Sequence, residues 1–264
     1  MRIGLGTYAY FWRRSDRMPA PMSLHDMLED TAALGGTVFQ ICDYPEIESW
    51  DRAALSDLRA HAETLGVELE LGTRGIRREH LNPYLGLAEL LGVSLIRTMQ
   101  NTATDHPGPD EFDAELRQML DELSDRGVTL ALETYEQVAT RVLVDEVQRL
   151  ASPNVGVCLD VANVVARLET QESVIDLAAP HVVNLHIKDF RFRRSPGLIG
   201  FELTGAELGT GVLSLDYLMG AVRPDERDIG VIVEHWLPWL GDARKTADVE
   251  ATWSTAALDR LKRQ

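Results

Sequence analysis

The feature that most constrains the fold is an alternation of strand and helix patterns that repeats eight times along the chain. Short apolar runs that end in turn or polar residues are typical of buried strands, and apolar residues spaced three or four apart are typical of helices. Such helical spacing is found, for example, at Leu55, Leu58, Ala62 and Leu65. The strands are expected at Ile3–Thr7, Val38–Cys42, Glu68–Leu71, Leu95–Met99, Thr129–Glu133, Val155–Asp160, Val182–His186 and Ile229–Glu234.

Glycines mark the ends of several predicted helices, as in Leu65-Gly66-Val67 and Leu91-Gly92-Val93. Glycine readily adopts the left-handed conformation that ends a helix. Eight strand–helix units predict an α/β fold with one domain over residues 1–264, a (β/α)₈ TIM barrel whose active site lies at the C-terminal face of the strands. A doubly wound open sheet is the alternative, but the chain has no phosphate-binding glycine motif directly after a predicted strand.

Two connections between predicted elements are unusually long, Tyr8 to Met22 and Lys188 to Asp228. Both follow the C-terminal ends of predicted strands, the face where barrel enzymes carry their catalytic loops. We therefore expect both connections to act as candidate lids. The second is expected to carry a helix of its own around Leu215–Val222.

Charge and composition exclude several classes of protein. The chain has 26 basic and 42 acidic residues, a net charge of −16, which opposes binding to nucleic acid or to an anionic membrane. An apolar fraction of 45% excludes disorder, and the apolar runs are shorter than the ~20 residues that span a bilayer. The N-terminal MRIGLGTY does not resemble a signal peptide, so we expect a cytoplasmic protein with Cys42 and Cys158 reduced in its core.

Four consecutive predicted strands end in a residue that can bind a metal ion: Glu133, Asp160, His186 and Glu234. A single carboxylate at a strand end often caps a helix, but four such residues on adjacent strands would meet on one side of the barrel mouth. Three carboxylates there would repel one another without a cation. Oxygen ligands with one imidazole favour one divalent ion, Mn²⁺ or Mg²⁺ first, with Co²⁺, Fe²⁺ or Zn²⁺ as alternatives.

Further candidates lie beside these strand ends. Lys188 is two residues past His186 and points the same way if the strand continues, so it is a candidate to steady a developing oxyanion; the alternative is a surface lysine paired with Asp189. Arginines at or after predicted strand ends suggest a substrate with a carboxylate or phosphate. They are Arg74, Arg97, Arg191 and Arg193. Tyr8, just after the first strand, is expected to help wall a small polar substrate.

Several segments carry a family resemblance: LALETYE, VGVCLDVANV, VVNLHIKD, GTGVLSLD and VIVEHW. Together they resemble the xylose-isomerase-like superfamily of TIM barrels, which includes sugar isomerases, sugar epimerases and endonuclease IV. In its ketose 3-epimerases a Glu, Asp, His, Glu set binds one Mn²⁺. The resemblance therefore implies metal binding by Glu133, Asp160, His186 and Glu234, and an acid/base role for Glu133 and Glu234 on opposite sides of the substrate.

The sequence departs from the epimerase pattern at Asn163. Ketose 3-epimerases have a histidine there, three residues after the metal-binding aspartate. Asparagine can hydrogen-bond a substrate oxygen but cannot act as an acid. The segments GTYAYFW, LELGTRG and LALETYEQ are more similar to the branch that includes 3-oxo-isoapionate decarboxylases.

The function implied is a divalent-metal-dependent enzyme that forms an enediolate from a small, anionic keto-sugar or oxo sugar acid. An isomerase or epimerase is expected first, and a decarboxylase of a 3-oxo sugar acid is the alternative. An endonuclease IV-like enzyme is opposed by the charge of −16. A metal-free binding subunit would keep the same fold. We expect a small-molecule partner, neither nucleic acid nor membrane, and we leave a homo-oligomer open.

Overall fold

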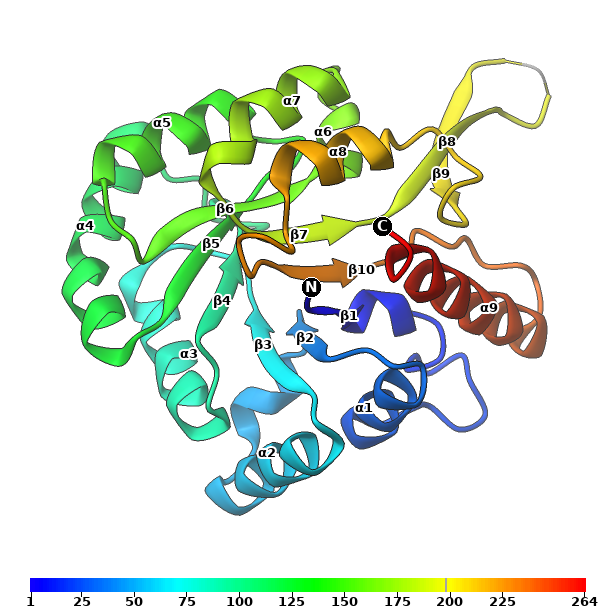
Figure 1. Cartoon of the computed structure of the whole chain (residues 1–264), viewed down its shortest axis with the longest axis horizontal. Helices are drawn as coiled ribbons and strands as arrows, with labels where there is room; N and C mark the ends of the chain where they lie inside the picture. The colour runs from blue at the N-terminus through cyan, green and yellow to red at the C-terminus, as the bar shows by residue number, and fades with distance from the viewer. Residues whose placement is uncertain (198) are drawn as a thin grey trace.

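Eight parallel strands form a closed barrel in the computed structural model, which describes residues 1–197 and 199–264 (Figure 1). The predicted barrel is confirmed. Around the barrel the strands are ordered β1-β10-β7-β6-β5-β4-β3-β2. Their bounds are β1 (Ile3–Gly6), β2 (Val38–Cys42), β3 (Glu68–Gly72), β4 (Leu95–Thr98), β5 (Thr129–Glu133), β6 (Val155–Asp160), β7 (Val182–Ile187) and β10 (Gly230–Val233).

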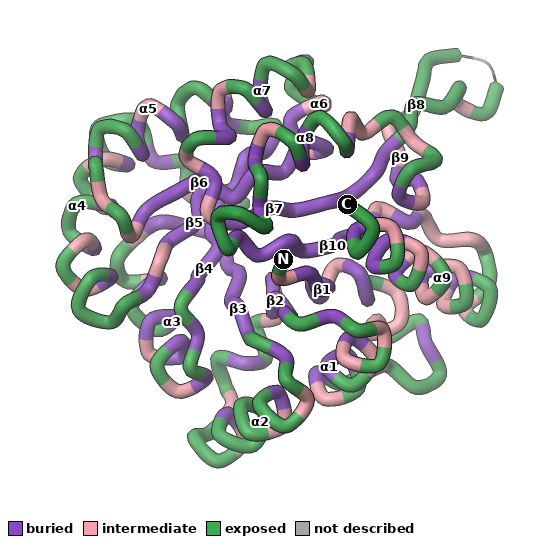
Figure 2. Tube along the Cα trace, in the orientation of Figure 1, coloured by how far each residue is buried: buried purple, intermediate pink, exposed green. Residues whose placement is uncertain are grey.

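Helices surround the barrel, and Figure 2 shows buried strands inside and exposed helix faces outside. Gly66 and Gly92 end two of these helices with φ of +68° and +70°, as the sequence predicts. The helices are α1 (Leu24–Ala33), α2 (Arg52–Leu65), α3 (Arg78–Leu91), α4 (Pro109–Arg126), α5 (Thr140–Leu150), α6 (Val161–Val165), α7 (Gln171–Ala178), α8 (Leu215–Val222) and α9 (Ala243–Leu261). Among the described residues, none of the helices combines the length and apolarity needed to cross a membrane.

The barrel closes where the first strand meets the last. Ile3 pairs with Val231 and Leu5 with Val233 across β1 and β10. The barrel walls and helices bury a continuous apolar core that includes residues from both ends of the chain, such as Leu5 and Leu258. Closure therefore fixes the radius of the barrel and the positions of all the strand ends around one mouth.

Cys42 and Cys158 are free and buried in the barrel strands, as the sequence predicts. Burial raises the pKa of both thiols well above its usual value. Each sulfur contacts a polar side chain of the barrel interior, Cys42 at Gln40 and Cys158 at Asn184. Both cysteines therefore act as core residues rather than as nucleophiles.

The long connection after β7 contains more structure than the sequence predicts. The expected helix is present as α8, and before it an antiparallel hairpin projects beyond the barrel body (Figure 1). Its strands are β8 (Asp189–Arg194) and β9 (Phe201–Ala206). The first strand reads DFRFRR, and this alternation of apolar and polar residues is the signal that predicts a strand.

Candidate active site

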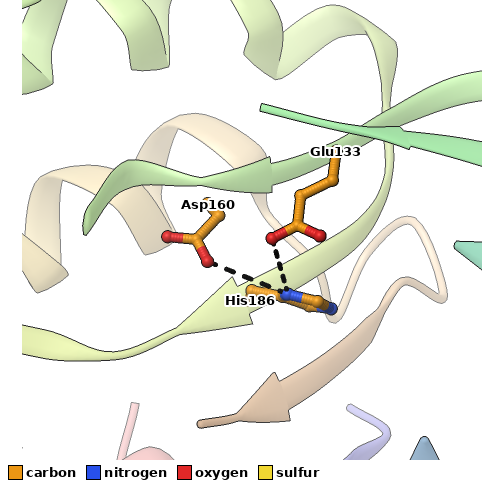
Figure 3. Close-up of side chains that lie close together, drawn as sticks. All are labelled: Glu133, Asp160 and His186. Carbon is orange, nitrogen blue, oxygen red and sulfur yellow. Dashed lines mark ion pairs between the residues drawn. The ribbon is translucent and has the colours of Figure 1, made fainter. Parts of the chain in front are cut away.

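The four predicted metal ligands meet at the C-terminal mouth of the barrel. Glu133 and Asp160 end β5 and β6, His186 lies near the end of β7, and Glu234 directly follows β10. Strand register explains the meeting, because Asp160 and His186 are paired across β6 and β7. Figure 3 shows the carboxylates of Glu133 and Asp160 directed at the imidazole of His186. None of the four is more than 2% exposed.

One nitrogen, Nδ1 of His186, faces three carboxylates. It lies 3.6 Å from Glu133 Oε1, 3.9 Å from Asp160 Oδ2 and 3.5 Å from Glu234 Oε1. One ligand atom each from Glu133, Asp160 and His186 lies within 4.8 Å of the others, a spacing found in no other group of His, Cys, Asp and Glu among the described residues. Glu234 stands outside that tight group but beside the same nitrogen.

The donor atoms of this cluster fit a divalent cation. His186 Nδ1 and Glu234 Oε1 are buried and have no hydrogen-bond partner, and Asp160 Oδ2 is paired with Lys188. A buried polar atom left unpaired costs about 1–3 kcal/mol, so native proteins rarely leave several together. Carboxylate oxygens and one imidazole nitrogen are ligands that Mn²⁺ and Mg²⁺ accept. The unpaired atoms therefore indicate where a metal ion would bind.

Lys188 lies inside the site rather than on the surface. Its Nζ is 2.8 Å from Asp160 Oδ2 and 2.7 Å from Glu234 Oε2, and it lies 5.0 Å from the centre of the Trp236 ring. Burial alone would lower the pKa of Lys188, but the two carboxylates outweigh it and raise that pKa above its usual value. The lysine therefore keeps its charge. The alternative partner, Asp189, instead accepts hydrogen bonds from backbone N–H groups.

Arg97 is buried against Glu133 on the other side of the cluster. Its Nη1 also donates to the Thr73 carbonyl at 2.9 Å. Burial by itself would raise the pKa of Glu133, but the charges of Arg97 and His186 outweigh it and hold that pKa well below its usual range. Asn163 Nδ2 donates to Glu133 Oε1 at 2.8 Å. Glu133 is thus held as a carboxylate, which suits a ligand better than a proton donor.

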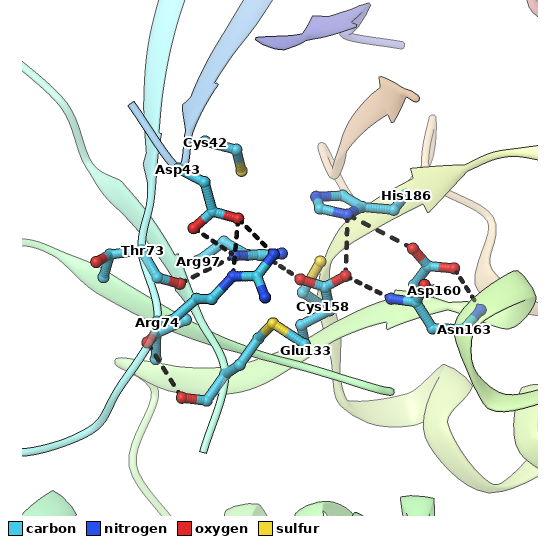
Figure 4. Close-up of polar contacts among 12 residues, drawn as sticks. Cys42, Asp43, Thr73, Arg74, Arg97, Glu133, Cys158, Asp160, Asn163 and His186 are labelled. Carbon is cyan, nitrogen blue, oxygen red and sulfur yellow. Dashed lines mark hydrogen bonds and ion pairs between the residues drawn. The ribbon is translucent and has the colours of Figure 1, made fainter. Parts of the chain in front are cut away.

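A second polar group lies at the cavity mouth and depends on a residue that the sequence analysis missed, Asp43. Tyr8 Oη donates to Asp43 Oδ2 at 2.7 Å. Arg74 Nε donates to the same oxygen at 2.9 Å (Figure 4). Burial raises the pKa of Asp43, but Arg97, Arg74 and Tyr8 outweigh it and lower that pKa overall. Asp43 directly follows β2, so the rule that selected the four predicted metal ligands at strand ends could have selected it.

A cavity of about 310 Å³ opens onto this arrangement. Seven of the residues predicted for the site line it: Tyr8, Arg74, Arg97, Glu133, Asn163, Lys188 and Glu234. Two others, Asp160 and His186, are buried and do not belong to this lining. Arg191 lies outside this lining, on the exposed hairpin, where it donates to Thr210 Oγ1 at 2.9 Å. Arg193 pairs with Glu202 across the same hairpin. The structure thus joins Arg74 and Arg97 to the site but not these two arginines.

Comparison with known proteins identifies the family. The family model for the xylose isomerase-like TIM barrel matches residues 28–258. The chain belongs to this family. It is also 51% identical over 261 residues, 99% of this chain and 95% of the relative, to a 3-oxo-isoapionate decarboxylase of Pectobacterium atrosepticum. These matches show that the protein is an enzyme and confirm the resemblance seen in the sequence.

Solved structures of the family share the fold at low sequence identity. A D-psicose 3-epimerase from Clostridium cellulolyticum H10, solved with D-tagatose, has a TM-score of 0.77 at 16% identity and covers 100% of this chain and 99% of its own. A xylose isomerase-like TIM barrel protein from Mycobacterium smegmatis, solved with magnesium, has a TM-score of 0.69 at 17% identity, with 97% of both chains covered. At such identities the likeness concerns the fold alone.

Proposed function

We propose that this enzyme is a divalent-metal-dependent carboxy-lyase that removes CO₂ from a 3-oxo sugar acid, with 3-oxo-isoapionate as the first substrate to test. The observation that carries the proposal is the 51% identity, over 99% of the chain, to a 3-oxo-isoapionate decarboxylase. The geometry of the cavity supports it in three ways, through the metal-ligand cluster, the pairing of Glu133 and the positive groups at the mouth.

In this proposal Glu133, Asp160, His186 and Glu234 would hold the ion, with Mn²⁺ or Mg²⁺ expected. A bound divalent ion supplies Lewis acidity that stabilises negative charge on a substrate oxygen. The reaction breaks the bond between the carboxylate carbon and the carbon next to it. The electron pair passes into the 3-oxo group to give an enediolate, CO₂ leaves, and one proton is then added to that carbon. No oxidant or reductant is needed.

We assign to the pair of Lys188 and Glu234 the stabilisation of negative charge on the substrate and the delivery of the proton to the substrate carbon. Their 2.7 Å contact lies in the cavity wall, where the lysine charge can stabilise the developing enediolate oxygen. Burial raises the pKa of Glu234, but Lys188 and His186 outweigh it and lower that pKa, so Lys188 is the protonated member of the pair. The Lys188 ammonium is therefore assigned as the donor of the proton that the substrate carbon takes up, and it is reprotonated from solvent. Glu133, predicted from the sequence as one of two acid/base residues, is assigned instead as a ligand, because Arg97 holds it as a carboxylate.

The pairing of Glu133 with Arg97 favours the lyase over an epimerase. An epimerase with two bases must move a proton on each face of the substrate, so both glutamates must accept or donate protons. A decarboxylase needs one protonation only. Asn163, which cannot act as an acid, lies beside the same glutamate and is proposed to bind a substrate oxygen.

The substrate anion is proposed to bind at the positive side of the cavity. Arg74 and Arg97 line it in a chain whose net charge is −16, and Tyr8 stands between Arg74 and Asp43. Planar guanidinium groups bind carboxylates well. Arg191 remains a predicted contact that would require the hairpin to approach the substrate. We further infer that the enzyme is cytoplasmic and acts on a small molecule. That it forms a homo-oligomer remains a prediction.

The test measures the release of CO₂ and the incorporation of deuterium into the product. The protein with added Mn²⁺ is mixed with a 3-oxo sugar acid in D₂O, and NMR and CO₂ release are compared with a sample without enzyme. We expect one CO₂ per substrate consumed and one deuterium in the product. EDTA and Lys188→Met should each lower the rate by about 10² or more. Arg126→Met, an exposed residue at the end of α4, should leave it unchanged.

Two outcomes would contradict the lyase. Deuterium uptake without loss of carbon would show an isomerase or epimerase on the same scaffold. A rate that EDTA does not change, in a protein that retains no metal by mass spectrometry, would remove the metal-dependent reaction and favour a binding subunit.

A further inference from the structure

Three polar side chains lie inside the barrel beneath the metal-ligand cluster, and the active-site chemistry above makes no use of them. Gln40 of β2, Glu70 of β3 and Asn184 of β7 are each at most 2% exposed. Gln40 Nε2 donates to Glu70 Oε2 at 2.9 Å and to Asn184 Oδ1 at 3.0 Å, and Asn184 Nδ2 donates to the same Glu70 oxygen at 2.9 Å. The network ends at His186, whose Nε2 lies 2.8 Å from Gln40 Oε1.

Burial raises the pKa of Glu70, and the hydrogen bonds from Gln40 and Asn184 and the charge of Arg2 oppose that rise. With Glu70 ionised, the chemistry of these groups allows one direction for the hydrogen bonds. A carboxylate only accepts, so the NH₂ groups of Gln40 and Asn184 must face Glu70. The carbonyl of Gln40 must then face His186, and a carbonyl also only accepts. His186 Nε2 therefore carries the proton. A reversed Gln40 amide would place its oxygen against both Glu70 and the Asn184 oxygen.

The direction of the network decides which nitrogen is free at the metal-ligand cluster. In the neutral imidazole that can bind a metal ion, a proton on Nε2 leaves the lone pair of His186 on Nδ1, the atom that faces Glu133, Asp160 and Glu234. A histidine that binds a metal ion generally donates its other N–H to a partner that fixes the ring. Here that partner is the side-chain amide of Gln40, which could adopt either of two orientations. The carboxylate of Glu70, on a third strand, fixes the orientation of that amide.

We propose that Gln40 and Glu70 are positioning residues that hold His186 in the Nε2–H tautomer, so that Nδ1 is presented to the divalent ion. This inference rests on the metal site of the proposed function and does not depend on which reaction the enzyme catalyses. Loss of such a supporting contact typically costs 10- to 100-fold in metal affinity.

The test measures Mn²⁺ affinity by electron paramagnetic resonance, with no substrate present. Gln40→Met keeps the side-chain length but removes the acceptor, and should weaken Mn²⁺ binding roughly 10- to 100-fold. Glu70→Gln, which changes little in size, allows the Gln40 amide to turn over and should weaken binding about tenfold. Thr31→Val removes a buried hydroxyl in α1, away from the barrel mouth, and should leave the affinity unchanged.

A double substitution tests whether the direction of the hydrogen bonds matters, or only the presence of polar groups. In Gln40→Glu with Glu70→Gln, the carboxylate at 40 accepts from His186 Nε2–H and from the amide at 70. Asn184 can turn its amide over and keep both bonds. We expect this variant to recover Mn²⁺ affinity to within about threefold of the wild type, whereas Gln40→Glu alone opposes two carboxylates and should not.

Nitrogen-15 NMR of histidine-labelled protein with Mg²⁺ reads the tautomer directly, with His186→Asn used to assign the signal. A proton on Nε2 supports the inference. A proton on Nδ1, or Mn²⁺ affinities of Gln40→Met and Glu70→Gln within threefold of the wild type, would overturn it while leaving the metal site standing. Failure of the wild type to bind Mn²⁺ would overturn the metal site as well.

Discussion

At the scale of single residues, arginines that look alike in sequence have different surroundings. Arg74 and Arg191 both follow barrel strands. Arg74 is held at the cavity by Asp43 and Tyr8, whereas Arg191 lies on a hairpin outside it. Hydrogen bonds to charged groups are worth about 1.5–3 kcal/mol, so the position of an arginine has a measurable effect on substrate binding.

We expect Arg74→Met to raise KM for an oxo sugar acid roughly 10- to 100-fold with a smaller change in kcat, because a carboxylate contact is lost. Steady-state kinetics with Arg126→Met as the control measures this. The same assay on Arg191→Met tests the predicted hairpin contact, since a matching rise in KM there would show that the hairpin reaches the substrate. An unchanged KM in Arg74→Met would remove this arginine from substrate binding.

Residue-level prediction succeeded where the evidence was local. The four predicted metal ligands each end a predicted strand, so their convergence followed from the strand pattern. Gln40, Glu70 and Asn184 lie inside strands rather than at their ends, and nothing local distinguishes a network from isolated buried polar groups. Asp43 was missed because the predicted strand was ended at Cys42, whereas the predicted last strand was extended to include Glu234.

At the scale of elements, the segment after β7 shows how one side chain can organise a loop. The carboxylate of Asp189 accepts four backbone hydrogen bonds, from Phe190, Gly209, Gly211 and Leu213, at 2.8–2.9 Å. These bonds join the base of the β8–β9 hairpin to the loop that precedes α8. The hairpin itself was not predicted, because the sequence of this connection indicated an extra loop and one helix only.

We expect Asp189→Asn to destabilise the fold by about 2 kcal/mol or more, because an amide presents N–H groups where the carboxylate accepted bonds. Urea unfolding measures the change, and hydrogen exchange should increase in residues 207–213. Glu202→Gln, on the exposed face of the hairpin, is the control and should change stability by less than about 0.5 kcal/mol. Equal stability of Asp189→Asn and the wild type would show that these bonds do not fix the loop.

The first long connection, Tyr8 to Met22, is held in place by hydrogen bonds to distant parts of the chain. The backbone N–H groups of Trp12 and Arg13 donate to Glu250 of α9 at 2.8 and 3.0 Å. Trp12 Nε1 also donates to the Leu237 carbonyl at 2.6 Å. The segment that the sequence predicted as a candidate lid is thus bonded to the last helix and to the loop after β10.

At the scale of the whole molecule, stability depends on the joining of the two ends of the chain. Helix α9 packs its buried residues, among them Leu258, into the same core as the first strand. We expect Leu258→Ala to cost about 2–5 kcal/mol, measured by urea unfolding, since it leaves a cavity in that core. Leu168→Ala, at a leucine that is 91% exposed, is the matched control and should change stability by about 0.5 kcal/mol or less. Similar losses in both variants would contradict the assigned core.

The amino-acid sequence by itself determined the eight strand–helix units, the rim on which their ends meet and the four residues that converge there. These features depend on local apolar patterns and on the parallel order of the strands. Tertiary structure alone decided the partners across the barrel. Gln40 and His186 are 146 residues apart, and their strands, β2 and β7, are not neighbours in the barrel order. Their hydrogen bond exists because closure sets the radius and register that bring two inward-facing side chains together, and no local pattern encodes that distance.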